Sequence, residues 1–337
     1  MGEFELIERY FKRGARQLAR GVALGIGDDC ALLQPAPDTQ IAISCDMLVQ
    51  GRHFFPEVDP VSLGHKALAV NLSDLAACGA QPRAFTLALA LPQADEAWLE
   101  AFSRGLFALA DAHQCELIGG DTTQGPLNIC ITVFGEVPVV NGRSQALLRS
   151  GARSGDDIYI SGTVGDARLT LDALNGKLDV PATVLALARL RLESPAPRVA
   201  LGLALRGVAS AAIDVSDGLL GDLGHVLKAS NCGATIDTSI AIELLAACCH
   251  SGNASAADKL QLSHQQQLSY VLAGGDDYEL LFTAPVSMRA VVETAARTSD
   301  TRVTRIGRIE AQPGLRLVDA QGKPVSGRFA SFDHFAR

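Results

Sequence analysis

Short apolar runs rich in β-branched residues alternate, along the first half of the chain, with longer segments whose apolar residues recur at helical spacing. The runs predict strands over 39–49, 83–91, 115–120 and 127–137. The longer segments predict helices over 62–79 and 95–113, and Gly79 ends the first of them. Strands that alternate with helices in this way predict an α/β domain.

The segment 150–162, a polar, glycine-rich turn that leads into a new strand, interrupts this pattern, and the alternation then starts again. The second half predicts helices over about 166–176, 181–191, 197–206 and 219–231, strands over 210–215, 233–239 and 278–285, and then one more helix and two terminal strands. The segment 250–267 is polar and is the most loop-like part of the chain. We therefore expect a mixed α+β or α/β fold with two domains, an N-terminal one over 1–149 and a C-terminal one over 150–337.

Composition narrows the class of protein. The chain has 337 residues, 48% of them hydrophobic, and a net charge of −8, so a packed core is expected and the basic footprint of a nucleic-acid-binding protein is absent. No apolar run reaches the length of a membrane span, and the N-terminus lacks the apolar stretch of a signal peptide. The eight cysteines form no C-x-x-C pair and have mostly apolar neighbours, which predicts small core residues in a reducing compartment. We expect a cytoplasmic protein that binds neither nucleic acid nor membrane.

Aspartates recur beside Gly, Ser or Thr at the expected edges of strands and helices. The stretch "GIGDDCALL" carries Asp28 and Asp29, and five further stretches carry Asp46, Asp74, Asp121, the pair Asp214 and Asp217, and the group Asp276, Asp277 and Glu279. Such edges are where α/β folds build ligand sites, but carboxylates that converge there repel one another unless cations neutralise them. Hard oxygen donors without a Cys/His set indicate Mg²⁺, which usually bridges carboxylates to substrate phosphates.

Each acidic element taken alone has a simpler interpretation. A Gly-Asp-Asp sequence is common in turns. Asp74 could be a polar helix position facing water, although its neighbours are apolar. Ser216 or Asp217 could cap the helix that begins near Leu219, and Asp166 is interpreted as a helix cap.

Three further residues also have alternatives to a role in a site. Asp277 and Glu279 could equally be surface groups, and Cys45, next to Asp46, is interpreted as a packing residue. The familiar phosphate-binding and nucleophile motifs are missing, because the sequence has no P-loop, no G-x-G-x-x-G after a strand, no protein-kinase set and no G-x-S-x-G elbow. Any phosphate is therefore expected to be held by metal and backbone amides.

Taken together and in order, the motifs become specific. "GIGDDCALL", "ISCDMLVQGRHF", "KALAVNLSDLAACGAQP", "LIGGDTTQGPL", "SGARSGDDIYISGTVGD", "AIDVSDGLLGDLGHVLKAS", "GGDDYELLFT" and "FDHF" run from residue 25 to residue 335. This series resembles the thiamine-monophosphate kinase family, within the superfamily of aminoimidazole-ribonucleotide-synthetase-like proteins. The resemblance covers essentially the whole chain.

The resemblance implies direct, in-line transfer of the γ-phosphoryl group of ATP to thiamine monophosphate, with several Mg²⁺ ions and no assigned catalytic base. It implies a homodimer, an N-terminal domain that forms a β-barrel across the dimer, and active sites at the junction of the domains. By motif match, the residues implied for Mg²⁺ are Asp29, Ser44, Cys45, Asp46, Asp74, Asp121, Asp214 and Asp217. Those implied for ATP are Gly120, Asp121, Arg149 and Ser216, and those implied for the thiamine substrate are His53, Asp276 and Phe332.

Two positions depart from the family pattern. Cys45 stands where Thr is expected, and a thiol is a poor Mg²⁺ ligand, so any metal contact there would use the backbone carbonyl. Asp276 stands where Glu is common, which shortens the reach to the substrate. For Phe332 a core position, and for Arg149 a surface position, remain open as alternatives. The alternative functions are another ATP-using synthetase of the same superfamily and a non-catalytic nucleotide- or metal-binding protein.

Overall fold

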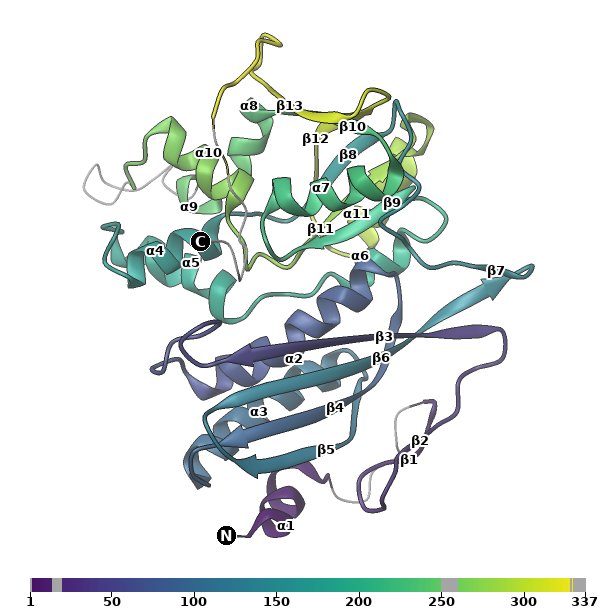
Figure 1. Cartoon of the computed structure of the whole chain (residues 1–337), viewed down its shortest axis with the longest axis vertical. Coiled ribbons are helices and arrows are strands. Elements are labelled where there is room, and N and C mark those ends of the chain that lie inside the picture. The colour runs from purple at the N-terminus through teal and green to yellow at the C-terminus, as the bar shows by residue number, and fades with distance from the viewer. Residues whose placement is uncertain (1, 14–19, 250–259, 328, 330–337) are drawn as a thin grey trace. The chain divides into compact units, whose positions relative to one another are not determined.

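A computed structural model describes residues 2–13, 20–249, 260–327 and 329, and the chain divides into two compact units (Figure 1). The first unit consists of Met1–Leu75 and Ala80–Ala146, and the second consists of Ala76–Gly79 and Leu147–Arg337. No helix in the described part of the chain is both long enough and apolar enough to cross a membrane.

The first unit is an α/β arrangement built on one mixed sheet. Its elements are α1 (Glu3–Leu6), the π-helix η1 (Ile7–Phe11), β1 (Val22–Leu24), β2 (Leu32–Leu33), β3 (Thr39–Val49), α2 (Pro60–Ala77), β4 (Gln81–Leu91), α3 (Glu96–Ala112), β5 (Glu116–Gln124), β6 (Asn128–Val140) and β7 (Arg143–Ser144). The sheet has the order β3-β6-β4-β5, and β7 pairs with β6. The β3–β6 and β6–β4 pairs are antiparallel, whereas β4 and β5 are parallel.

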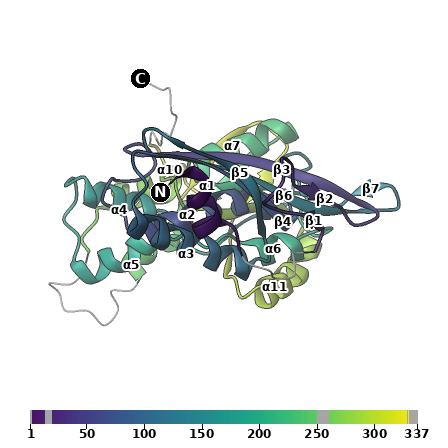
Figure 2. The same ribbon diagram turned by 90° about the horizontal axis from the view of Figure 1, so that it is seen from below.

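Helices α2 and α3 lie together on one face of this sheet (Figures 1 and 2). The two helices can pack this closely because glycine occurs where they meet: a Cβ on Gly64 would lie 2.1 Å from the carbonyl oxygen of Phe102, and one on Gly105 would lie 1.9 Å from that of Val61. The apolar side chains of α2, such as Leu68 and Leu72, are fully buried. The two helices therefore cover one face of the sheet and bury the apolar side chains of that face.

The opposite face of the sheet is open within the unit. Ser44 on β3 donates its hydroxyl to Asp74 on α2, so its strand neighbours point away from the helices. On that other face, Ile43 is 62% exposed, Met47 is 52% exposed, and Cys45 is also exposed. Strand β3 is 11 residues long and pairs only with β6 among the described strands. A long apolar edge strand of this kind is normally covered by another chain or element.

The second unit is built on a six-stranded sheet of order β13-β10-β12-β8-β11-β9. Its elements are β8 (Asp157–Ser161), α4 (Asp166–Leu174), α5 (Ala182–Glu193), α6 (Val199–Ala204), β9 (Ala211–Val215), α7 (Leu219–Ser230), β10 (Gly233–Asp237), α8 (Thr238–Ala241), η2 (Ile242–Leu244), α9 (Ala246–Cys249), α10 (His264–Ala273), β11 (Glu279–Ala284), η5 (Val286–Met288), α11 (Arg289–Thr298), β12 (Val303–Glu310) and β13 (Gly314–Val318). All its strand pairs are antiparallel except β10–β13. Its core joins the sheet to α4, α5, α7 and α10, with buried side chains such as Ile213, Leu223 and Val271.

Most of the predicted elements are present, with ends displaced by a few residues. The strand predicted over 39–49 is β3, and the helices predicted over 62–79 and 95–113 are α2 and α3. The prediction of a loop over 250–267 is wrong at its end, because α10 begins at His264 behind a capping box of Ser263 and Gln266. Residues 250–259 lie outside the described part of the chain.

Candidate functional site

Strand β3 and helix α2 bring three of the expected metal-binding residues together at one edge of the first sheet. The hydroxyl of Ser44 donates to Asp74 Oδ2, and the backbone N–H of Asp46 donates to Oδ1 of Asn71, one turn before Asp74 on α2. Asn71 is buried and also donates to the carbonyl oxygen of Ala67, so its side chain is fixed. We call Ser44, Asp46 and Asp74 the β3 group.

His53 is held in the turn that follows β3. Its Nδ1 accepts a hydrogen bond of 2.9 Å from the backbone N–H of Val49, the last residue of the strand. This bond leaves Nε2 as the protonated nitrogen of a neutral ring. His53 therefore lies at the same end of the unit as Asp46, with its orientation set by the strand end.

A second group lies at the opposite edge of the same sheet, on and beside β5. Asp29, Gly120 and Asp121 all line one cavity of about 660 Å³, and we call these three residues the β5 group. The backbone N–H of Asp29 donates to Asp28 Oδ1 at 2.9 Å, and both side chains are exposed, as Asp121 is. The other walls of the cavity come from the N-terminal helices, through Phe4, Ile7, Glu8, Phe11 and Lys12. A polar edge beside an apolar wall can hold a phosphate-bearing ligand with an aromatic part.

Position 120 on β5 can hold only glycine, because of its backbone conformation and its close contact with β4. Its φ is +147°, and a Cβ there would lie 1.8 Å from the carbonyl oxygen of Leu87 on the neighbouring strand. At the adjacent Gly119, a Cβ would meet nothing within 4 Å. The chain therefore offers a matched pair of glycines for a test.

We expect Gly120→Ala to lower the free energy of unfolding by about 1–3 kcal/mol, because the added methyl group meets backbone that cannot move aside cheaply. Gly119→Ala is the control and should change stability by less than about 0.5 kcal/mol. Urea unfolding of both variants checks this. Equal losses in the two variants would contradict the assigned close contact.

The β3 group and the β5 group are far apart in one chain. Asp46 pairs with Ile131, Ile131 pairs with Leu87, and Leu87 pairs with Gly120, so three interstrand spacings, or about 14 Å, separate Asp46 from Gly120. Within the described part of one chain, no three His, Cys, Asp or Glu side chains come close enough together to hold a metal ion. The oxygen donors at both edges nonetheless suit Mg²⁺ by their chemistry.

The second unit brings four more of the expected residues together at the end of β9. Asp214 lies near the end of that strand and is 5% exposed, and Ser216 and Asp217 follow in the loop before α7. Asp276 joins them, because its backbone N–H donates to the carbonyl oxygen of Ser216 at 2.8 Å. We call these residues the β9 group.

Asp222, in the first turn of α7, shapes this loop, and the sequence did not single it out. Its Oδ2 accepts three hydrogen bonds of 3.1 Å, from the backbone N–H groups of Ser216, Asp217 and Gly218. Burial and the nearby Asp217 raise the pKa of Asp222 to about 7, and the three N–H donors act against that rise. The sequence did hold a signal for this role, because Asp222 closely follows "SDG" and lies in the first turn of an expected helix, where a carboxylate can accept hydrogen bonds from backbone N–H groups.

The helix caps expected at Ser216 or Asp217 and at Asp166 differ from those that the structure shows. The N-cap of α7 is Gly218, and no side chain caps that helix, so Ser216 and Asp217 are left to the loop itself. Asp166 does cap a helix, but a different one: its carboxylate accepts from the backbone N–H groups of Ala246 and Ala247, which begin α9. Burial raises the pKa of Asp166, and those two bonds oppose the rise.

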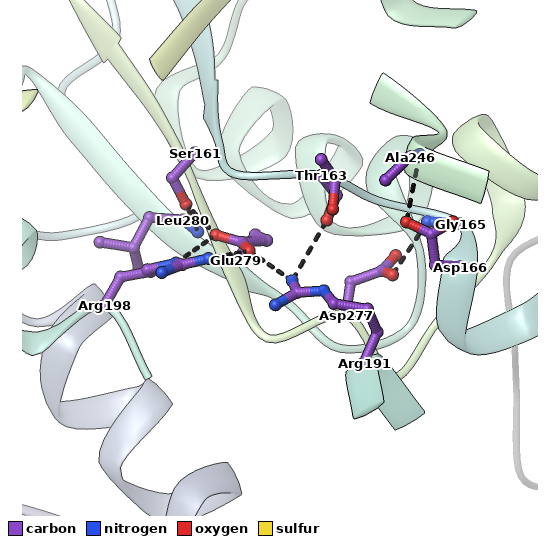
Figure 3. Close-up of polar contacts among 10 residues, drawn as sticks. All are labelled: Ser161, Thr163, Gly165, Asp166, Arg191, Arg198, Ala246, Asp277, Glu279 and Leu280. Carbon is purple, nitrogen blue, oxygen red and sulfur yellow. Dashed lines mark hydrogen bonds and ion pairs between the residues drawn. The ribbon is translucent and has the colours of Figure 1, made fainter. Parts of the chain in front are cut away.

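Asp277 and Glu279 are not surface groups, since they are 1% and 0% exposed. Glu279 receives bidentate bonds of 2.6 Å from Arg198, a bond from Arg191 and one of 2.5 Å from Ser161, as Figure 3 shows. The sequence pattern did not predict the burial of these two carboxylates, because acidic residues can be buried when hydrogen-bond and ion-pair partners reach them from elements far away in the sequence.

Three other residues that the sequence assigned to the site do not belong to the groups described above. Arg149 is exposed and lies beside the start of β9, where Leu148 accepts from the backbone N–H of Ala212, rather than at the end that carries Ser216. Phe332 lies outside the described residues. Cys45 is exposed, with its Sγ 3.4 Å from Cys130 Sγ, so its interpretation as a packing residue is wrong for the single unit. The expectation that the cysteines are core residues is confirmed for Cys115 and Cys232, which are buried, and is wrong for the exposed Cys30.

Comparisons with known proteins cover nearly the whole chain. Residues 27–137 match the AIR synthase related protein, N-terminal domain, and residues 153–320 match the corresponding C-terminal domain. The thiamine-monophosphate kinases of Salmonella typhimurium and Escherichia coli K12 are each 46% identical to this chain in an alignment of 340 positions, which covers 99% of this chain and 98% of each relative.

Solved structures agree in fold. The crystal structure of thiamine-monophosphate kinase from Stenotrophomonas maltophilia K279a is 44% identical, with a TM-score of 0.79 and 96% of each chain covered. A structure described as "AaThiL complexed with AMPPCP and TMP" is 27% identical, with a TM-score of 0.71 and 89% of each chain covered. Escherichia coli HypE, a hydrogenase maturation protein, shares the fold at 20% identity and a TM-score of 0.71.

Proposed function

The chain belongs to the thiamine-monophosphate kinases of the AIR synthase related family, and from this we propose how it transfers the γ-phosphoryl group of ATP to thiamine monophosphate. The full-length identity of 46% carries the assignment of the reaction. The related structure with AMPPCP and TMP supports ATP and thiamine monophosphate as the two substrates. The alternatives, another ATP-using synthetase and a non-catalytic binding protein, are not favoured, because relatives of 44–46% identity over nearly the whole chain are thiamine-monophosphate kinases, whereas HypE shares only the fold at 20% identity.

We propose that the working enzyme is a homodimer whose first sheets close into a barrel. Three observations support this: the apolar face with Ile43 and Met47 is open, β3 is a long edge strand, and the outer edge of β5 pairs with no other described strand. A two-fold axis that sets the β3 edge of one subunit against the β5 edge of its partner, twice, would cover both edges and enclose both apolar faces.

This dimer also accounts for the separation of the acidic groups. Residues that lie about 14 Å apart in one chain would meet if the β3 group of one subunit faced the β5 group of its partner. We propose that Mg²⁺ is held there by Asp46, Asp74 and Ser44 from one side and by Asp29 and Asp121 from the other. The C-terminal residues Asp214 and Asp217 complete the proposed set, and the carbonyl of Cys45 remains a candidate ligand.

The chemistry needs little beyond positioning and charge neutralisation. The acceptor is already a phosphate anion, so no general base is required, and the obstacle is the repulsion between two anionic substrates. Bound Mg²⁺ would neutralise the phosphate oxygens as charge spreads over them. The backbone amides around Gly120 can approach phosphate closely because no side chain stands there, and Ser216 and the guanidinium of Arg149 are proposed to contact ATP.

The thiamine end of the acceptor needs different groups. We propose that Asp276 faces the cationic thiazolium or the aminopyrimidine, that His53 donates to the substrate through Nε2, and that Phe332 stacks on a ring. In this proposal residues 1–149 supply dimerisation and the main metal and ATP motifs, and residues 150–337 complete the nucleotide and substrate site. A cytoplasmic location stays a prediction.

Purified protein given ATP, Mg²⁺ and thiamine monophosphate is expected to form ADP and thiamine diphosphate in equal amounts, with no product from unphosphorylated thiamine. EDTA should stop the reaction, and added Mg²⁺ should restore it, because the repulsion between the two substrates returns without a cation. Chromatographic separation of the thiamine phosphates measures both effects. Activity that persists in EDTA would contradict the proposed metal dependence.

A further inference from the structure

The turn that carries Asp276 has an unfavourable backbone conformation. Asp276 has φ +65° and Tyr278 has φ +52°, in the left-handed region that side-chain-bearing residues avoid. The backbone of the turn is bound to the end of β9 and to the loop that follows it: the N–H of Asp276 donates to Ser216 O, and the N–H of Tyr278 donates to Val215 O, each at 2.8 Å. The Tyr278 hydroxyl also donates to Asp276 Oδ1 at 3.0 Å, which fixes the direction of that carboxylate.

Between these two residues, the side chain of Asp277 points into the unit. Its Oδ1 accepts a hydrogen bond of 2.9 Å from the backbone N–H of Gly165, the residue that precedes α4 (Figure 3). Asp277 is 1% exposed, and its Oδ2 has no hydrogen-bond partner in the described part of the chain. The turn is thus attached on two sides, through its backbone to β9 and through Asp277 to the start of α4.

The surroundings of Asp277 favour a neutral carboxylic acid. Burial raises its pKa well above the usual value, and the carboxylates of Asp166 and Glu279 raise it further, against the lowering effects of Gly165 and Arg191. Arg191 is already bonded to Glu279, so its guanidinium is paired with a carboxylate other than that of Asp277. A neutral group at this position can keep the Gly165 bond without the cost of an unpaired buried charge.

We infer that Asp277 is a positioning residue, which holds Asp276 and Tyr278 in their left-handed conformation and so aims Asp276 at thiamine monophosphate. The inference rests on the proposed contact between Asp276 and that substrate. Asp277 itself touches neither substrate in this arrangement, since its side chain faces Gly165.

The test compares Asp277→Ala with Asp277→Asn. The Ala variant is expected to raise KM for thiamine monophosphate by at least about tenfold and to leave KM for ATP within about twofold, because a displaced turn misdirects one substrate contact. It should also speed hydrogen exchange at the amides of Asp276 and Tyr278 by about tenfold or more. Asn is neutral and of the same shape, so it should restore both values to near those of the unchanged enzyme.

Asp166→Asn is the matched control, because Asp166 is equally buried in the same cluster but bonds to α9 rather than to the turn. It should lower the melting temperature without a change in either KM. Unchanged exchange at the two amides in Asp277→Ala, or a parallel rise in both KM values, would overturn the inference. An Asp276→Asn enzyme with an unaltered KM for thiamine monophosphate would instead contradict the proposed substrate contact, and the exchange rates would still decide whether Asp277 holds the turn.

Discussion

Co-expression of an Asp46→Asn chain with an Asp121→Asn chain is expected to restore activity that neither variant has alone. Each variant by itself should lose at least about 100-fold in kcat, because each lacks a carboxylate that is proposed to hold the cation that neutralises the transferring phosphoryl group. In a mixed dimer of the proposed form, one of the two sites would combine Asp46 from one subunit with Asp121 from its partner and would be intact. Random assembly then gives about a quarter of the activity of the unchanged enzyme.

The reason lies in the order of the first sheet. With β3 and β5 at opposite edges of the sheet, the proposed site unites the two carboxylates by taking one from each of two chains. The measurement uses two differently tagged chains, purified through both tags, so that every dimer assayed is mixed. Such dimers should show about half of the normal activity, one intact site out of two.

A second pair of variants controls for partial activity of the single mutants. Asp46→Asn and Asp74→Asn both alter the β3 group, so every site in their mixed dimer carries a defect, and activity should stay low. Failure of the first pair to recover activity, with dimers demonstrated, would mean that each site is built within one chain. Equal recovery in both pairs would show that the variants, rather than the assembly, explain the result.

Local patterns in the sequence were enough to place most elements. The run 39–49 became β3 because its β-branched and apolar residues suit an edge strand that is half covered, and Gly79 follows the end of α2 with a φ of +64°. The short N-terminal helices, by contrast, were not predicted. They follow no long apolar period, and η1 has π-helical bonding that periodicity does not encode.

The arrangement of the candidate site residues could not be predicted from the sequence. The resemblance to the kinase family implied one metal set for Asp46 and Asp121, whereas only the sheet order shows that β3 and β5, which carry them, lie at opposite edges of the unit. Asp277 and Glu279 read as possible surface groups because their partners, Gly165, Arg191 and Arg198, lie 81 to 112 positions away in the chain. Pairings of this kind are set by tertiary packing, which no local pattern reveals.

Glu279→Gln is expected to lower the free energy of unfolding of the second unit by about 3–5 kcal/mol, the largest stability effect among these variants. The fully buried carboxylate neutralises Arg191 and Arg198, whose side chains are only 20% and 19% exposed. Gln keeps the shape and one acceptor oxygen but removes the charge, so two guanidinium groups stay in a poorly solvated place without a counter-ion. Urea unfolding, followed by a probe in the second unit, gives the change.

Glu310→Gln is the matched control, because the Glu310–Arg308 pair is exposed, with 29% and 63% of the two side chains accessible, and should contribute at most about 1 kcal/mol. Since a two-domain chain need not unfold in one step, the comparison uses the midpoint of the transition that belongs to the second unit. A loss in Glu279→Gln no larger than that in Glu310→Gln would mean that the arginines find water or other acceptors. A large loss that Arg191→Met partly reverses would instead locate the cost in the uncompensated positive charge, as argued from the burial of this network.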